Sequence, residues 1–129
     1  MEANILVVDD SAAIRKILQR ILRQTGLAIG LIHEACDGQQ ALEVLRAQKV
    51  NLVLTDINMP TMDGLQLLAA MKSAPTWKQL PVVMITTEGG EAKVAEAVRL
   101  GANGYVRKPF TGDQIKEKLA AFLEPALPL

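Results

Sequence analysis

Residues 53–60 read VLTDINMP, an apolar run that ends in the carboxylate of Asp56 and reaches a proline four positions later. Residues 52–55 have the length and the β-branched content of a strand that is buried on both faces. Four similar runs occur elsewhere in the chain, at residues 5–8, 31–35, 82–86 and 104–106. We therefore predict five buried strands, one of which carries Asp56 at its end.

Helical patterns separate the predicted strands. Ser11 can cap a first helix, in which apolar residues recur at helical spacing until Gly26 stops it. Three further helix starts show capping-box spacing, in which an N-cap residue is followed three positions later by Gln. They are Asp37 with Gln40, Asp63 with Gln66, and Thr111 with Gln114.

The helix between the fourth and fifth strands is predicted over residues 90–100, with Ala95 and Val98 facing inward. The last helix is expected to bury a row of apolar side chains. These are Ile115, Leu119 and Phe122.

Other side chains have ordinary structural interpretations. Trp77 lies in a loop with two prolines and is expected to cover the edge of the core, and Cys36 is expected to be a small core residue. Residues 124–129 are expected to fray. The polar face of the first helix is interpreted as solvated; it carries Arg15, Lys16, Arg20 and Arg23.

Alternation of five strands with five helices predicts an α/β fold in a single domain of 129 residues. Right-handed crossovers then place helices on both faces of a parallel sheet, which makes the fold a doubly wound sandwich. Sheets of this kind hold their sites outside the carboxyl ends of the strands, where the strand order reverses. The residues at that edge are therefore the candidates for function.

The composition excludes several classes of protein. The chain has 14 Lys and Arg against 14 Asp and Glu, so no net field favours nucleic acid or an anionic membrane as partner. One cysteine, Cys36, and one histidine, His33, leave no internal disulfide and no Cys/His metal cluster. The N-terminus has neither a signal peptide nor a spanning helix, so we expect a soluble, cytoplasmic protein.

Chemically able side chains gather at the predicted carboxyl edge. They are Asp9 and Asp10, Asp56, Thr86 and Thr87, and Arg107 and Lys108. Three converging carboxylates repel one another unless a cation is present, and Mg²⁺ takes such oxygen ligands. The backbone carbonyl of Asn58 could add a further ligand. The ammonium of Lys108 and the hydroxyl of Thr86 suit an anionic group with several oxygens, such as a phosphoryl group.

Each of these pieces also has an ordinary structural explanation. Two acids after a strand often form a turn or cap a helix, a Lys-Pro pair is commonly a loop entry, and Asp63–Gly64 is common turn chemistry. Their joint occurrence, in chain order and each at a strand end, favours a site.

Four segments together resemble the response-regulator receiver domain. They are ILVVDDS (5–11), VLTDINMPTMDG (53–64), VVMITTEGG (82–90) and GANGYVRKPF (101–110). The resemblance covers nearly the whole chain and is strongest to the single-domain chemotaxis regulators. It implies a flavodoxin-like (βα)5 fold with the strand order 2-1-3-4-5.

The resemblance also implies roles at the acidic edge. Asp56 would be the phosphoacceptor, attacking a phosphohistidine to give an acyl phosphate. Asp10 and Asp56 would bind Mg²⁺ directly, Asp9 would bind it through water, and the Asn58 carbonyl would complete the protein ligands. Lys108 would pair with a phosphoryl oxygen.

A switch is implied beside this site. The peptide bond into Pro109 would be cis, as in the family. Thr86 would reach for the phosphoryl group, and its movement would let Tyr105 turn inward and reshape the surface of the last two helices and the strand between them. Without these flanking motifs, Tyr105 would be interpreted as a half-buried core residue.

Two positions would influence how fast the acyl phosphate is hydrolysed. They are Asn58, two residues after Asp56, and Glu88, two residues after Thr86. Both match the chemotaxis pattern, which implies a short-lived signal. The sequence departs from the commonest chemotaxis pattern at Thr87 and Ile57, and these departures bear on lifetime and partner fit.

The implied function is a phosphorylation-controlled signalling module that acts by changing which protein it binds, without separate enzyme activity. A histidine kinase would be the phosphodonor, the flagellar motor switch the output partner, and a phosphatase could act on the complex. Because the last helix is followed only by residues 125–129, we expect no output domain. We also expect the protein to be a monomer. The basic face of the first helix could also help to dock a kinase.

Three alternatives differ in class or pathway. One is a receiver in another phosphorelay. A Mg²⁺-dependent aspartyl-phosphate hydrolase is the enzyme alternative, but Asn58 stands where such an enzyme needs its general acid. A flavin-binding domain would need a phosphate loop after the first strand, where Asp9 and Asp10 would repel phosphate.

Overall fold

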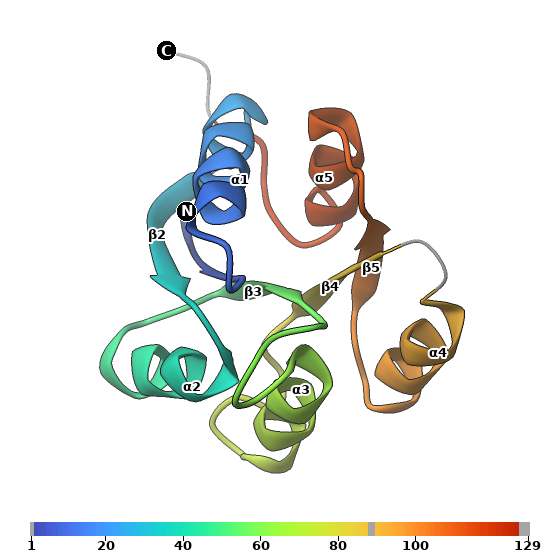
Figure 1. The fold of residues 1–129 in the computed structure, drawn as a ribbon. Coiled ribbons are helices and arrows are strands. Elements are labelled where there is room, and N and C mark those ends of the chain that lie inside the picture. Colours follow the sequence, from blue (N-terminus) through green and yellow to red (C-terminus); the bar gives the residue numbers. More distant parts are fainter. Residues whose placement is uncertain (1, 88–89, 127–129) are drawn as a thin grey trace.

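The computed structural model describes residues 2–87 and 90–126, and these contain one sheet of parallel strands in the order β2-β1-β3-β4-β5 (Figure 1). The strands are β1 (Ala3–Val8), β2 (Ile29–Ala35), β3 (Leu52–Asp56), β4 (Val82–Thr86) and β5 (Gly104–Arg107). The helices are α1 (Ala12–Gln24), α2 (Gly38–Ala47), α3 (Gly64–Ser73), α4 (Glu91–Arg99) and α5 (Gly112–Leu119). The predicted fold class and strand order are confirmed.

The sheet is the middle of three layers. Helices α1 and α5 cover one face, and α2, α3 and α4 cover the other (Figure 1). In β1, Ile5 and Val7 belong to the core under α1 and α5, whereas Leu6 and Val8 belong to the core on the opposite face. All four side chains are fully buried, which explains why β1 is a continuous apolar run and not an alternating one.

The register of the sheet brings the carboxyl ends of the central strands to the same level. Val8 of β1 lies opposite Thr55 of β3, and Asp56 lies opposite Ile85 of β4. Because parallel strands run in the same direction, a residue that follows any of these ends emerges at one edge of the sheet. The acidic residues after β1 and at the end of β3 are neighbours for this reason.

The predicted helix caps are present with one difference. Asp63 and Thr111 form complete capping boxes with Gln66 and Gln114. At α2 the Asp37 side chain accepts from the Gln40 N–H, but the Gln40 side chain accepts from the N–H of Cys36, at 2.7 Å, so the box closes one residue early. The caps explain why α2, α3 and α5 start where capping-box spacing places them.

The predicted inward face of α4 is wrong. Ala95 is exposed and Val98 is 59% exposed, whereas Ala97 is buried in the core. The helix is only Glu91–Arg99 and has Ala97 as its buried residue, so a narrower stripe than predicted faces inward. Val98 is therefore a large apolar side chain in contact with water.

Smaller differences concern the ends of elements. Helix α5 stops at Leu119, so Ile115 and Leu119 are buried as predicted but Phe122 lies beyond the helix and is 36% exposed. Strand β2 begins at Ile29, two residues before its predicted start. Cys36 is half-buried instead of lying in the core.

Trp77 packs against the core as expected, on the face that α2, α3 and α4 cover. Among the described residues, no helix is long and apolar enough to span a bilayer.

Candidate functional site

Three carboxylates converge at the carboxyl edge of the sheet. Asp9 and Asp10 follow β1, Asp56 ends β3, and one carboxylate oxygen of each lies within 4.8 Å of the others. Asp9 and Asp56 are only 1% and 5% exposed, whereas Asp10 is exposed. The structure thus brings together the three acids that the sequence placed at this edge.

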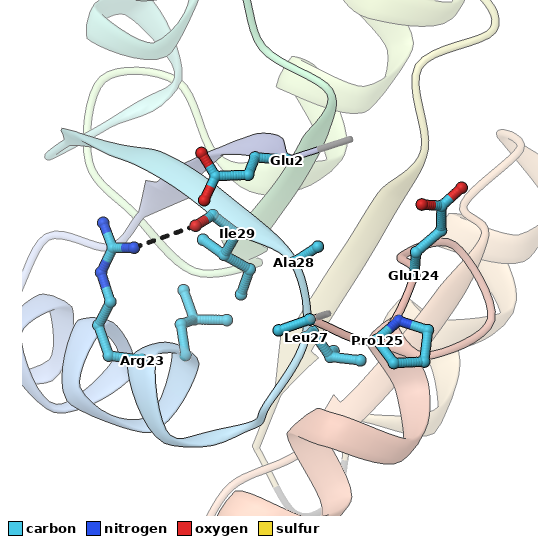
Figure 2. Close-up of a pocket in the computed structure, with 9 residues that line it drawn as sticks. Glu2, Arg23, Leu27, Ala28, Ile29, Glu124 and Pro125 are labelled. Atoms are coloured by element: carbon cyan, nitrogen blue, oxygen red, sulfur yellow. Dashed lines mark hydrogen bonds between the residues drawn. The ribbon is translucent and has the colours of Figure 1, made fainter. Parts of the chain in front are cut away.

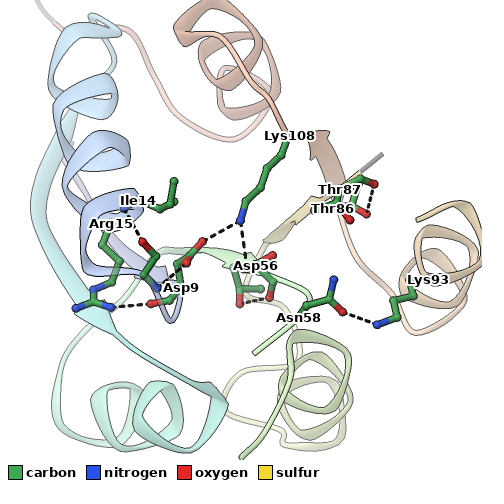
Figure 3. Close-up of polar contacts among 11 residues, drawn as sticks. Asp9, Ile14, Arg15, Asp56, Asn58, Thr86, Thr87, Lys93 and Lys108 are labelled. Carbon is green, nitrogen blue, oxygen red and sulfur yellow. Dashed lines mark hydrogen bonds and ion pairs between the residues drawn. The ribbon is translucent and has the colours of Figure 1, made fainter. Parts of the chain in front are cut away.

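Lys108 joins this cluster from the loop after β5. Its Nζ lies 3.3 Å from Asp9 Oδ2 and 3.2 Å from Asp56 Oδ2 (Figure 3). Its backbone N–H donates to the carbonyl oxygen of Thr86 at 2.6 Å, which fixes the start of this loop against β4. The Lys108–Pro109 peptide bond is cis, as the resemblance implied.

The protonation of the cluster reflects its burial. Burial raises the pKa of the Asp56 carboxyl; Lys108 opposes this rise and the Asp9 carboxylate adds to it. Burial alone would lower the pKa of the Lys108 ammonium, but its attraction to Asp56 and Asp9 and its hydrogen bonds to them outweigh burial and raise it. One ammonium therefore compensates the buried carboxylates only in part.

The donor set fits a hard divalent cation. Carboxylate oxygens on adjacent strand ends, with one exposed acid that leaves room for water, are the ligands that Mg²⁺ takes in octahedral sites. The incomplete charge compensation at Asp56 points the same way, because a cation would remove it. The cluster can hold such an ion, with Asp9, Asp10 and Asp56 as its side-chain ligands.

Asn58 lies close to the site, but its side chain turns toward α4. Its Oδ1 accepts a hydrogen bond from Lys93 Nζ (Figure 3). The backbone carbonyl of Asn58 remains a predicted metal ligand. Lys93 had no distinguishing signal in the sequence, because the contact joins segments that are 35 residues apart.

The loop between β3 and α3 is held tightly against the end of β3. The Gly64 N–H donates to the Ile57 carbonyl oxygen at 2.8 Å, and a Cβ at Gly64 would lie 2.2 Å from the carbonyl oxygen of Asp56. On the other side of the loop, the Gly38 N–H donates to the Met62 carbonyl oxygen at 2.9 Å. Gly64 is therefore required by a close approach to the backbone of Asp56, and not by turn chemistry alone.

Thr86 ends β4 and is buried, with 3% of its surface exposed. Its hydroxyl donates to the carbonyl oxygen of Thr87 at 3.3 Å. A Cβ at Gly90 would lie 2.4 Å from Thr86 Oγ1, so the start of α4 packs directly on this hydroxyl. Thr86 thus links the end of β4 to the start of α4.

Tyr105 does not join the acidic cluster. It is 37% exposed, and Lys118 Nζ of α5 lies 5.9 Å from the centroid of its ring. The inward position of Tyr105 was expected only once a phosphoryl group is present and Thr86 has moved, so it stays a prediction; here the ring lies outward. Glu88, the other predicted lifetime residue, lies outside the described residues.

Arg15 departs from the sequence prediction. It was placed on the solvated face of the first helix, but its side chain is 17% exposed and turns back toward the site (Figure 3). Nη1 donates to the carbonyl oxygen of Asp9 at 2.7 Å. The sequence shows that Arg15 lies four residues after the Ser11 cap. It does not show where the side chain points, because helical periodicity carries no information about contacts with the loop before the helix.

Comparison with known proteins identifies the family to which the chain belongs. A model of the response regulator receiver domain matches residues 5–120. The chain belongs to this family. As a receiver domain it is a phosphoaccepting response regulator.

This chain is similar to known chemotaxis proteins over most of its length and most of theirs. It is 43% identical over 120 residues to the chemotaxis protein CheY1 of Helicobacter pylori, covering 92% of this chain and 95% of that one. Identity to the chemotaxis protein CheY of Pseudomonas aeruginosa is 41% over 120 residues, with 93% and 95% covered. The structure of the chemotaxis response regulator CheY4 of Vibrio cholerae superposes with a TM-score of 0.85 at 30% identity, covering 95% of this chain and all of that one.

Proposed function

We propose that this receiver domain accepts a phosphoryl group on Asp56 from a histidine kinase, with Mg²⁺ bound at the acidic cluster, and signals in chemotaxis. The observation that carries the proposal is the buried Asp56 carboxylate at the sheet edge, 3.2 Å from Lys108 and beside two further carboxylates. The chemotaxis assignment is supported by the relatives, which are named chemotaxis proteins.

The chemistry follows from the positions of these side chains. An Asp56 carboxylate oxygen attacks the phosphorus atom of a phosphohistidine, the new O–P bond forms as the P–N bond breaks, and the imidazole leaves with the electron pair of that bond. A bound Mg²⁺ supplies charge neutralisation between carboxylates and phosphoryl oxygens. Lys108 moves its hydrogen bond from the carboxylates to a phosphoryl oxygen, and the Thr86 hydroxyl turns from the Thr87 carbonyl toward the same group.

In this proposal, phosphorylation changes a surface that binds the partner protein. Movement of Thr86 opens space for the ring of Tyr105 and changes the surface of α4, β5 and α5, where Val98 and Tyr105 are exposed. The partner is the flagellar motor switch, and a phosphatase shortens the signal. The chain acts as a monomeric single domain in the cytoplasm, in keeping with its one free cysteine.

Acetyl phosphate tests the phosphoacceptor directly. Incubation with Mg²⁺ should add one phosphoryl group, about 80 Da, to the intact protein measured by mass spectrometry. The variant Asp56→Asn should show no gain. Asp113→Asn, which changes an exposed acid in the first turn of α5, is the matched control and should gain the group as the wild type does.

Other outcomes would contradict the proposal. A gain that persists in Asp56→Asn would move the acceptor to another residue, and steady release of phosphate from diverse phosphate esters would favour a hydrolase. Absence of any gain in the wild type would argue against phosphoacceptor chemistry.

The pathway needs a separate measurement. The flagellar motor-switch protein of the same cell should bind the phosphorylated receiver more tightly than the unphosphorylated one, as measured by calorimetry or surface plasmon resonance. Equal binding of both forms would point to another phosphorelay.

A further inference from the structure

Arg15 makes contacts that a solvated helix residue would not make. It lies in the first turns of α1, where its backbone N–H donates to the Ser11 carbonyl oxygen at 3.0 Å. From there its guanidinium forks. Nη1 donates to the carbonyl oxygen of Asp9 at 2.7 Å and Nε donates to Glu34 Oε1 at 2.9 Å.

The Asp9 carbonyl lies at the point where the sheet stops. The Asp9 N–H still donates to the Ala35 carbonyl oxygen, at 3.1 Å, one residue beyond the end of β1. Strand β2 ends at Ala35, so it does not continue alongside the Asp9 carbonyl. That carbonyl oxygen instead accepts a hydrogen bond from Arg15 Nη1. The guanidinium therefore takes the place of a continuing strand and ties the end of β1 to Glu34 of β2.

The same tie fixes the peptide between the first two acids. The Asp9 side chain is already held, because Oδ1 accepts from the Ser11 N–H at 2.9 Å and Oδ2 lies 3.3 Å from Lys108. Asp10 is exposed, and within residues 2–87 and 90–126 no hydrogen bond holds its carboxylate. The direction of the Asp10 side chain therefore depends on the orientation of the Asp9–Asp10 peptide, whose carbonyl Arg15 grips.

We propose that Arg15 is a positioning residue for the divalent cation, because it fixes the Asp9–Asp10 peptide and so directs both carboxylates to one point. This inference rests on the proposed function, which places Mg²⁺ at the acidic cluster. Groups that orient metal ligands without touching the metal commonly change its affinity about 10-fold to 100-fold when removed.

Charge and geometry predict opposite effects for removal of Arg15. A positive charge close to a metal site disfavours Mg²⁺, so loss of the charge alone would tighten binding. The Glu34 carboxylate at 2.9 Å offsets much of that charge, which leaves the forked hydrogen bonds as the larger contribution. Positioning therefore predicts that removal weakens binding, and the sign of the change separates the two explanations.

The experiment is a titration of the full chain with MgCl₂ alone, at constant ionic strength, followed by ¹H–¹⁵N NMR. Arg15→Met should raise the Kd for Mg²⁺ about tenfold. Arg15→Lys keeps the charge but cannot reach both the Asp9 carbonyl and Glu34, so it should also raise the Kd. Arg20→Met is the matched control: Arg20 is exposed on the same helix and makes no hydrogen bond or ion pair in the described part of the chain, so its Kd should equal that of the wild type.

A purely structural role for Arg15 would lower the melting temperature and leave the Kd of the folded protein unchanged, and this result would overturn the inference. Tighter Mg²⁺ binding in Arg15→Met, or wild-type affinity in Arg15→Lys, would also overturn it. If Arg15→Met does not fold, Arg15→Lys carries the same comparison.

Failure of the two proposals can be told apart. A wild-type protein that binds no Mg²⁺ and gains no phosphoryl group contradicts the proposed function. A wild-type protein that does both, with Arg15→Met binding Mg²⁺ equally well, contradicts only the role of Arg15.

Discussion

Helix α1 places one arginine at each edge of the sheet, and the two arginines do different work. At the carboxyl edge Arg15 grips the Asp9 carbonyl beside three carboxylates. At the amino edge Arg23 donates to the carbonyl oxygen of Ile29 at 3.2 Å (Figure 2), and also to that of Gly30 at 2.7 Å. That contact closes the start of an edge strand next to a surface pocket of about 470 Å³.

The surroundings of the two arginines explain the difference. The amino-edge pocket has an apolar lining from Leu22, Leu27 and Ile29, and its charged side chains lie at the rim in contact with water. At the carboxyl edge the charges are inside, where Asp9 and Asp56 are almost fully buried. The charged groups at the amino edge therefore lie in water, whereas the buried carboxylates at the carboxyl edge are compensated only in part by Lys108.

The largest expected change in stability comes from replacing a glycine at the carboxyl edge, and a glycine at the amino edge gives the comparison. Gly64→Ala would force a Cβ to within 2.2 Å of the Asp56 carbonyl oxygen and should lower the free energy of unfolding by about 3 kcal/mol. At Gly26, in the loop after α1, a Cβ would meet no atom within 4 Å, but the backbone has a φ of +76°. Gly26→Ala should therefore lower the free energy of unfolding by only about 1 kcal/mol. Urea denaturation measures both; equal losses would show that close packing at Asp56 does not matter.

Lys108→Met tests the compensation of charge at the carboxyl edge. Without metal the variant leaves Asp9 and Asp56 buried without their ammonium and should be less stable by about 2 kcal/mol, reduced from larger values for fully buried pairs because Lys108 is partly exposed. Mg²⁺ should raise the melting temperature of the variant more than that of the wild type, since the ion replaces the lost charge. A smaller rise in the variant would contradict this account.

Asp56→Asn should have the opposite sign. Because burial raises the pKa of the Asp56 carboxyl, its ionised form disfavours the folded state, and the variant should be more stable at neutral pH without metal. The gain should be on the order of 1 kcal/mol, since Lys108 offsets part of the repulsion from Asp9.

The pH dependence of this gain follows from the direction of the shift. A raised folded pKa means that the penalty is complete above that pKa and disappears as the carboxyl takes up its proton, so the two proteins should converge toward and below pH 3.8, the ordinary value. Chemical denaturation over a pH series measures the convergence. A difference that stays constant with pH would refute ionisation of Asp56 as its cause.

The smallest expected effect lies at the amino edge. Arg23→Met removes two hydrogen bonds to carbonyl oxygens at the start of β2, one of them part-buried, and should lower the free energy of unfolding by about 0.5–1 kcal/mol. Its affinity for Mg²⁺ should equal that of the wild type, in contrast to Arg15→Met. A weaker affinity would mean that α1 transmits changes along its whole length.

The sequence predicted what depends on local pattern. The apolar runs that became β1 and β3 and the capping residues Asp63 and Thr111 carry their structural meaning within a few positions. Convergence of the acids also followed, because parallel strands place their ends at one edge.

What the sequence could not predict depends on contacts between distant segments. The inward turn of Arg15 requires the loop after β1 and Glu34 on β2, and the Lys93–Asn58 contact joins α4 to the loop after β3. The exposure of Val98 depends on how α4 lies against the rest of the fold, which buries Ala97 and leaves Val98 59% exposed. Helical spacing alone contains none of this information.

The tight seating of the β3–α3 loop has a consequence for the direction in which a signal can travel. The Gly64 N–H donates to the Ile57 carbonyl oxygen and the Gly38 N–H donates to the Met62 carbonyl oxygen, so two backbone hydrogen bonds hold this loop beside Asp56. In the proposed function, a phosphoryl group on Asp56 would displace this loop only at the cost of these hydrogen bonds. In the proposed function, Thr86 is the residue that moves toward the phosphoryl group, and because the start of α4 packs on its hydroxyl, the change would pass to that flank of the molecule.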